Sequence, residues 1–75
     1  MSKIAVRGVD CLGVTTFYNF NTKESSLLIT SGDDILNRMD TSTWEGNMML
    51  LFLTEFVIEE DHNKFKKVLR ELREK

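Results

Sequence analysis

Proline is absent from the 75-residue chain, and it contains a single cysteine and four glycines. Without proline or a low-complexity stretch, nothing in the sequence is typical of a linker between domains. One cysteine excludes a disulfide framework and a zinc site with several thiolate ligands. The longest unbroken apolar run, Met48 to Leu53, has six residues, whereas a membrane span needs about 20. These absences predict one domain, residues 1–75, in a reducing cytoplasm.

The chain also lacks a large excess of charge of either sign, because 10 basic and 12 acidic residues give a net charge of −2. That balance excludes a generally basic nucleic-acid binder. A domain this short buries little core, and small domains commonly gain stability from disulfides, metals or a partner subunit. The sequence offers neither disulfides nor a visible set of metal ligands, so we expect a partner subunit to supply the additional stability.

The first half of the chain reads as strands separated by turns. Residues 3–9 alternate loosely, residues 14–20 are rich in β-branched and aromatic side chains, and residues 25–30 follow a connection of hairpin length. Residues 35–39 fit a fourth strand or one helical turn, because the run is too short to show a period. These patterns predict an antiparallel meander.

Strand and helix compete over residues 47–58. Met48 to Leu51 favour a helix by intrinsic propensity, and the sequence Ser42-Thr43-Trp44-Glu45 matches a capping box. Gly46 would then lie in the first helical turn, and the later phenylalanine, valine and isoleucine residues favour a sheet. We predict a strand here.

The last segment has the clearest pattern. Phe65, Val68, Leu69 and Leu72 recur at helical spacing, and Asp61 is a suitable N-cap. The predicted helix covers residues 61–74. The fold class is therefore α+β: a small antiparallel meander of about four strands followed by one C-terminal amphipathic helix.

A strand over residues 48–53 would have two apolar faces, because alternate side chains point to opposite sides. One face would carry Met48, Leu50 and Phe52, and the other Met49, Leu51 and Leu53. One helix covers one face only. We therefore expect these six residues to build both the core and a homodimer, since closed two-fold dimers are the commonest oligomers.

No catalytic constellation is visible. His62 is the only histidine and is expected to be an exposed helix residue, and Cys11 is expected to be a semi-buried filler in a turn. The glycines form no phosphate-binding loop, and the carboxylates lack the spacing of a calcium loop. The sequence predicts no enzyme activity, no metal and no cofactor.

The charges are unevenly distributed along the chain. Residues 33–61 contain eight acids and one base, whereas residues 62–75 contain six bases and two acids. We interpret the acidic window as a surface for a basic or nucleic-acid-handling protein, with Trp44 as a candidate anchor. The predicted partner-binding residues are Asp33, Asp34, Asp40, Trp44, Glu45, Glu55, Glu59, Glu60 and Asp61.

The basic helix supports an alternative hypothesis, a small nucleic-acid-binding transcriptional regulator. Lys66, Arg70 and Arg73 share one helix flank and would contact phosphates. No stacking aromatic or recognition motif accompanies them.

In type, the chain resembles many accessory proteins of bacteriophages, which are small, single-domain and without catalytic motifs. That resemblance implies an inhibitor in the host cytoplasm that blocks a replication, transcription or defence machine, such as a DNA-binding channel.

Overall fold

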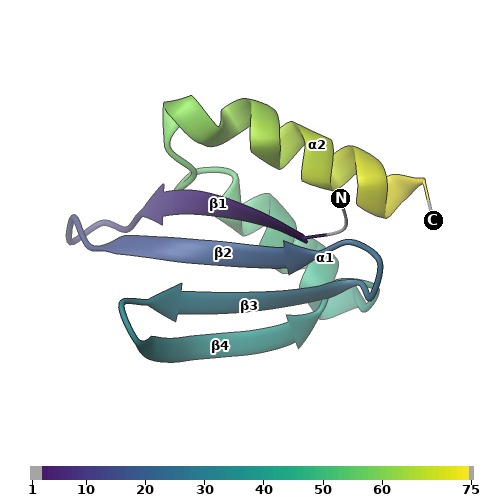
Figure 1. Cartoon of the computed structure of the whole chain (residues 1–75), viewed down its shortest axis with the longest axis horizontal. Helices are drawn as coiled ribbons and strands as arrows, with labels where there is room; N and C mark the ends of the chain where they lie inside the picture. Colours follow the sequence, from purple (N-terminus) through teal and green to yellow (C-terminus); the bar gives the residue numbers. More distant parts are fainter. Residues whose placement is uncertain (1–2, 75) are drawn as a thin grey trace.

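Four strands form one antiparallel sheet, in the order in which they follow along the chain (Figure 1). The computed structural model describes residues 3–74, with the side chain of Trp44 excepted. The strands are β1 (Lys3–Val9), β2 (Thr15–Asn21), β3 (Ser26–Ser31) and β4 (Asp34–Asp40). The sequence left residues 35–39 open, and the structure shows that they belong to the fourth strand. The meander followed by a C-terminal helix confirms the predicted α+β fold.

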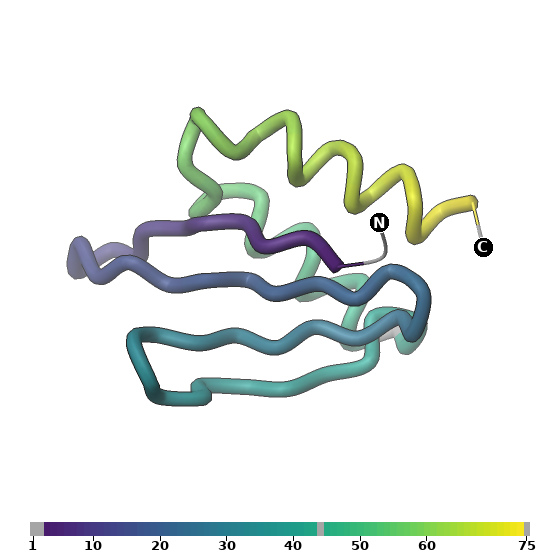
Figure 2. The backbone as a smooth tube through the Cα atoms, viewed as in Figure 1, coloured from purple at the N-terminus to yellow at the C-terminus, as the bar shows by residue number. Residues whose placement is uncertain are grey.

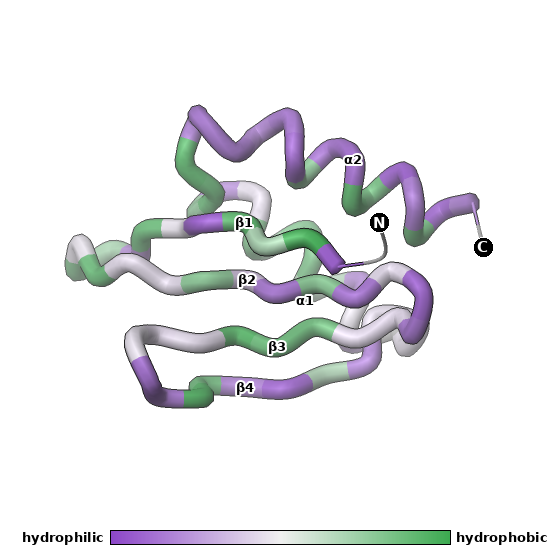
Figure 3. Tube along the Cα trace, viewed as in Figure 1, coloured by the Kyte–Doolittle hydropathy of each residue, from purple (hydrophilic) through white to green (hydrophobic). Residues whose placement is uncertain are grey.

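Both helices cover the same face of the sheet. α1 (Trp44–Leu53) crosses behind the strands, and α2 (His62–Arg73), preceded by the 3-10 turn η1 (Glu59–Asp61), runs along the β1 side (Figures 1 and 2). In Figure 3 the apolar residues of α2 lie on its sheet-facing side and the polar ones on the outside. Within residues 3–74, no helix or strand lies on the sheet's other face.

The core lies between this face and the helices. Val6 pairs with Tyr18 across β1 and β2, and Phe20 pairs with Leu27 across β2 and β3, so their side chains share one face. All four are at most 4% exposed. Phe65 of α2 packs on Phe20, with ring centroids 6.1 Å apart. Burial of these side chains is the main stabilising contribution to the fold.

The prediction of a strand over residues 47–58 is wrong, because residues 44–53 form α1. The Thr43 hydroxyl is the N-cap and accepts a hydrogen bond from the Gly46 backbone N–H at 3.0 Å. Gly46 was an argument against a helix in the sequence analysis, yet the first turn of α1 requires a glycine at this position. A Cβ atom at this position would collide with the carbonyl oxygen of Asp40 and come within 2.8 Å of the Thr41 Cα. The glycine therefore allows the first turn of α1 to approach the end of β4.

Only a short piece of that segment behaves as a strand. Val57 forms an isolated bridge with Gly8 at the outer edge of β1. The Val9 N–H donates to the Phe56 carbonyl at 2.9 Å, and the Ile58 N–H donates to the Arg7 carbonyl at 3.1 Å. Residues 56–58 thus protect part of one sheet edge, while β4 forms the other edge.

Candidate protein-binding surface

The outward side of α1 is apolar and exposed. Leu50 and Leu53 turn toward the core and are 6% and 4% exposed. Met48, Leu51 and Phe52, which we call the outer ridge, are 49%, 70% and 58% exposed. Their spacing places them together on the side opposite the core, because an α-helix has 3.6 residues per turn. The predicted strand faces are therefore wrong, because helical spacing groups Leu50 with Leu53 on the buried side and Met48 with Leu51 and Phe52 on the exposed side.

Acidic side chains lie at both ends of the outer ridge. Glu45 is in the first turn of α1, and Glu55 follows its C-cap, Thr54. Both glutamates are exposed. Glu55 lies in the turn after the C-cap, and its backbone N–H donates to the Phe52 carbonyl at 3.4 Å, so it stays next to the end of the ridge. An apolar strip with a carboxylate at each end is thus presented to solvent.

The other predicted partner-binding acids do not join this strip in a single surface. Asp33 and Asp34 lie at the turn between β3 and β4, the opposite end of β4 from Asp40. Asp40 is exposed and bonded locally, since its Oδ1 accepts from the Ser42 hydroxyl at 2.6 Å and backbone N–H at 2.8 Å. Glu59 and Glu60 are exposed in η1. Trp44 begins α1, and its side chain is outside the described part of the chain.

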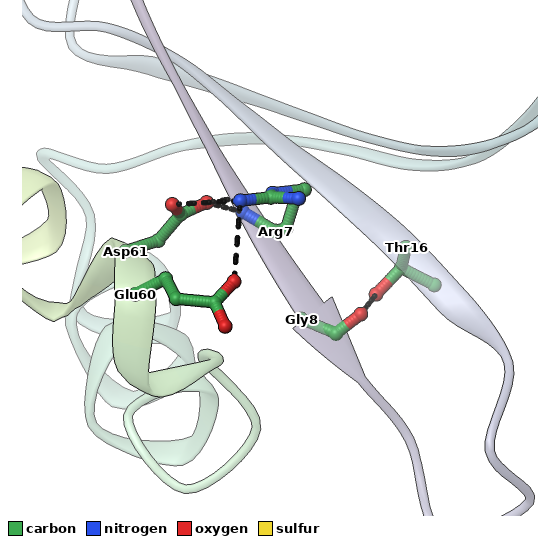
Figure 4. A network of polar contacts seen from close by, with 5 residues as sticks. All are labelled: Arg7, Gly8, Thr16, Glu60 and Asp61. Carbon is green, nitrogen blue, oxygen red and sulfur yellow. Dashed lines mark hydrogen bonds and ion pairs between the residues drawn. The ribbon is translucent and has the colours of Figure 1, made fainter.

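Asp61 is not available to a partner, because it is 2% exposed. Its carboxylate binds Arg7 of β1, 54 residues away in sequence (Figure 4). Asp61 Oδ2 accepts from the Arg7 backbone N–H at 2.8 Å and from Nε at 3.2 Å, and Oδ1 accepts from a terminal guanidinium nitrogen at 3.3 Å. Glu60 lies 3.7 Å from the same guanidinium.

The Arg7–Asp61 pair holds the start of α2 against the edge of β1. The hydrogen bonds from the Arg7 side chain, and then from its backbone N–H, hold the pKa of Asp61 below its ordinary value. The same side-chain bond raises the pKa of Arg7. Asp61 occupies the N-cap position as predicted, but its side chain makes no capping bond because it binds Arg7 instead. No spacing in the sequence signals this contact.

The remaining candidates lie apart from one another. Lys66 and Arg70 are exposed on α2, as is Arg73 near its end. His62 is exposed, as expected, with Nε2 3.1 Å from the Val57 carbonyl oxygen. Cys11 is exposed in the β1–β2 turn, so the expectation of a semi-buried filler is wrong.

Within residues 3–74 no three His, Cys, Asp or Glu side chains are grouped so that they could hold a metal ion. In the same range no helix is long and apolar enough to cross a membrane. Comparisons with protein-family models, with curated proteins and with solved structures give no match. The candidate surface therefore depends on the geometry of α1 itself.

Proposed function

We propose that this protein is a non-enzymatic binding protein that acts as a homodimer and docks an acidic surface onto a basic surface of another protein, which it thereby blocks. The outer ridge of α1 is the contact between the two copies. The single observation that supports this proposal is the exposure of Met48, Leu51 and Phe52 between two carboxylates.

The chain exposes more surface than a compact monomer of its mass. The chain exposes 5332 Å², whereas a compact monomer of this mass exposes about 4,700 Å². A stable interface buries about 800 Å² on each partner. The excess of about 600 Å² is spread over the whole chain, and pairing along the ridge would remove the most exposed apolar side chains of α1 from water.

Charge explains how the dimer would recognise its target. A two-fold axis through the ridge brings Glu45 and Glu55 of both copies to the rim of one contact. Four carboxylates gathered there repel one another, so the dimer is weakened at low ionic strength. A cationic partner surface relieves that repulsion. Because the partner binds the dimer more tightly than the monomer, partner binding also shifts the equilibrium toward the dimer.

Sedimentation equilibrium tests this coupling, with an oligolysine peptide as the basic probe. For the wild type, both added salt and added oligolysine should tighten the dimer. The double variant Glu45→Gln/Glu55→Gln should dimerise about fivefold more tightly at low salt, because two like-charge contacts are lost. It should also bind oligolysine more weakly.

The control is Asp33→Asn/Asp34→Asn, which removes the same charge far from α1. This variant should leave both the dimerisation constant and the oligolysine affinity close to wild type. Equal effects of the two double variants would show that only net charge matters, and would contradict a docking surface at α1.

A nucleic-acid-binding regulator is the second candidate, favoured by the exposure of Lys66, Arg70 and Arg73, three of the cations on α2. A gel-shift assay at low and high salt discriminates between the two functions. Binding that falls steeply with salt and disappears in the triple alanine variant would favour this candidate. Our first proposal expects no nucleic-acid complex under either condition.

A further inference from the structure

An open apolar groove of about 360 Å³ lies between the C-terminal half of α1 and the helix-covered face of the sheet. Its apolar lining comes from β2, β3 and the chain around the end of α1, and consists of Tyr18, Ile29, Met49, Phe52, Leu53 and Phe56. Tyr18, Ile29 and Leu53 are at most 8% exposed and form the floor, whereas Phe52 is 58% exposed. The rings of Phe52 and Phe56, with centroids 5.0 Å apart, form one wall. The groove is therefore an apolar site that solvent reaches.

The groove continues the outer ridge, because Phe52 belongs to both. The ridge alone is small for a dimer contact, since it supplies three side chains, whereas a stable interface takes about 20–30 residues on each side. A second copy seated on the ridge would also cover the groove beside it. An exposed part of that copy must then fill the groove, because an unfilled apolar cavity in an interface loses the packing contacts that stabilise it.

A leucine next to the groove is available for this contact. Within residues 3–74, with Trp44 excepted, Leu12 has the most exposed large apolar side chain, at 84%. It lies in the β1–β2 turn, which protrudes past the end of the sheet at the left of Figure 2. The same turn reaches the rim of the groove through Asp10 and Cys11. The chain thus presents an apolar side chain and an apolar groove side by side, and its own Leu12 does not fill its own groove.

Hydrogen bonds hold the β1–β2 turn in one shape. The Asp10 carboxylate accepts from the backbone N–H groups of Leu12 and Val14, both at 2.9 Å. The Asp10 N–H donates to the Val14 carbonyl at 3.1 Å, and the Gly13 N–H donates to the Asp10 carbonyl at 3.0 Å. Gly13 has a φ of +81°, which glycine adopts without strain. A turn fixed in this way loses little conformational entropy when its exposed leucine is buried, so Leu12 is a pre-organised anchor.

We propose that, in the dimer, the β1–β2 turn of each copy inserts Leu12 into the groove of the other copy. A two-fold axis makes every such contact twice, so two leucines are buried per dimer. A leucine side chain is smaller than the ligands that fill pockets of this size, and the apolar lining matches it. This inference rests on the proposed function, because it needs the dimer contact at the outer ridge, and it assigns the surface that the ridge alone does not supply.

Sedimentation equilibrium of Leu12→Ser tests the insertion. The substitution should raise the dimer dissociation constant about a hundredfold, because two leucine contacts per dimer are lost and burial of each is worth at least about tenfold in affinity. Leu12→Met, which keeps an apolar side chain of similar volume, should dimerise within about tenfold of wild type. The control Ile35→Ser removes a 59% exposed apolar side chain from β4, outside the lining of the groove, and should leave the dissociation constant unchanged.

NMR of a dimer mixed from ¹³C-labelled and unlabelled copies locates Leu12 directly. Isotope-filtered NOEs, which report only contacts between the two copies, should join the Leu12 methyl groups to the ring protons of Phe52 and Phe56. A dimer that meets along the ridge alone gives NOEs among the ridge side chains and none from Leu12.

Two results would overturn the insertion while leaving the ridge dimer in place. One is a Leu12→Ser variant that dimerises as tightly as wild type while Leu51→Ser is monomeric. The other is an absence of NOEs from Leu12 to the other copy in a sample that sedimentation shows to be dimeric. A wild type that stays monomeric at millimolar concentration would overturn the insertion and the proposed dimer together.

Discussion

Replacing Asp61 by asparagine should destabilise the protein strongly, although the two side chains have nearly the same shape. The Asp61 carboxylate accepts three hydrogen bonds from Arg7, at 2.8, 3.2 and 3.3 Å. An amide has only one acceptor oxygen, and its NH₂ group would face the donors of Arg7. The backbone N–H of Arg7 or its guanidinium then loses a partner.

The expected loss is about 2 kcal/mol, because a hydrogen bond to a charged group contributes about 1.5–3 kcal/mol and solvent screens part of this contribution at Arg7, whose side chain is 46% exposed. For a domain of this size, that lowers the melting temperature by about 8–16 °C. The control is Glu60→Gln, whose carboxylate is exposed and lies 3.7 Å from the same guanidinium. An exposed pair of this kind contributes at most about 1 kcal/mol.

Urea unfolding at several pH values measures both variants and checks the electrostatic origin of the effect. The folded-state pKa of Asp61 is lowered, so its stabilisation is present above the unfolded pKa of about 3.9. It is lost as the pH falls through the lower, folded pKa. The gap between wild type and Asp61→Asn should therefore be constant near neutrality and shrink below about pH 4. Equal stability of Asp61→Asn and Glu60→Gln at pH 7 would refute this reasoning.

Two further substitutions test the architecture around α1. Gly46→Ala should lower the melting temperature in thermal unfolding, because the alanine Cβ would collide with the backbone of Asp40 and Thr41. This loss should outweigh the higher helix propensity of alanine, which favours the variant by about 1 kcal/mol. A variant with a raised melting temperature would contradict the close approach of the two backbones. Leu50→Ala should cost about 2–5 kcal/mol, as a buried leucine does, whereas Leu51→Ala, at a position that is 70% exposed, should change the stability of the monomer by no more than about 0.5 kcal/mol. Similar costs for the two leucines would be inconsistent with a helix that buries only one side.

The strands and α2 could be predicted from sequence because each has a regular pattern over its length. Phe65, Val68 and Leu72 mark the buried side of α2, and the β-branched and aromatic run marks β2. Boundaries in the sheet differ by about one residue from the prediction, as expected where a turn residue fits either conformation.

α1 could not be assigned because it is apolar on both sides, and a helix without a polar side shows no 3.6-residue period. Gly46 favoured the strand assignment because glycine disfavours a helix interior. Its role in the close contact with the end of β4 becomes evident only from the structure. The Arg7–Asp61 contact escaped prediction for a related reason. It joins residues 54 positions apart, and neither has a local signal for the other.

Sedimentation equilibrium of the wild type and of Leu51→Ser is the most direct measurement of whether two copies meet along the exposed side of α1. Our account predicts that the wild type dimerises, more tightly as salt is raised, and that Leu51→Ser is monomeric with an unchanged melting temperature at low concentration. A wild type that stays monomeric at millimolar concentration, or a Leu51→Ser variant that dimerises as well as the wild type, would contradict it.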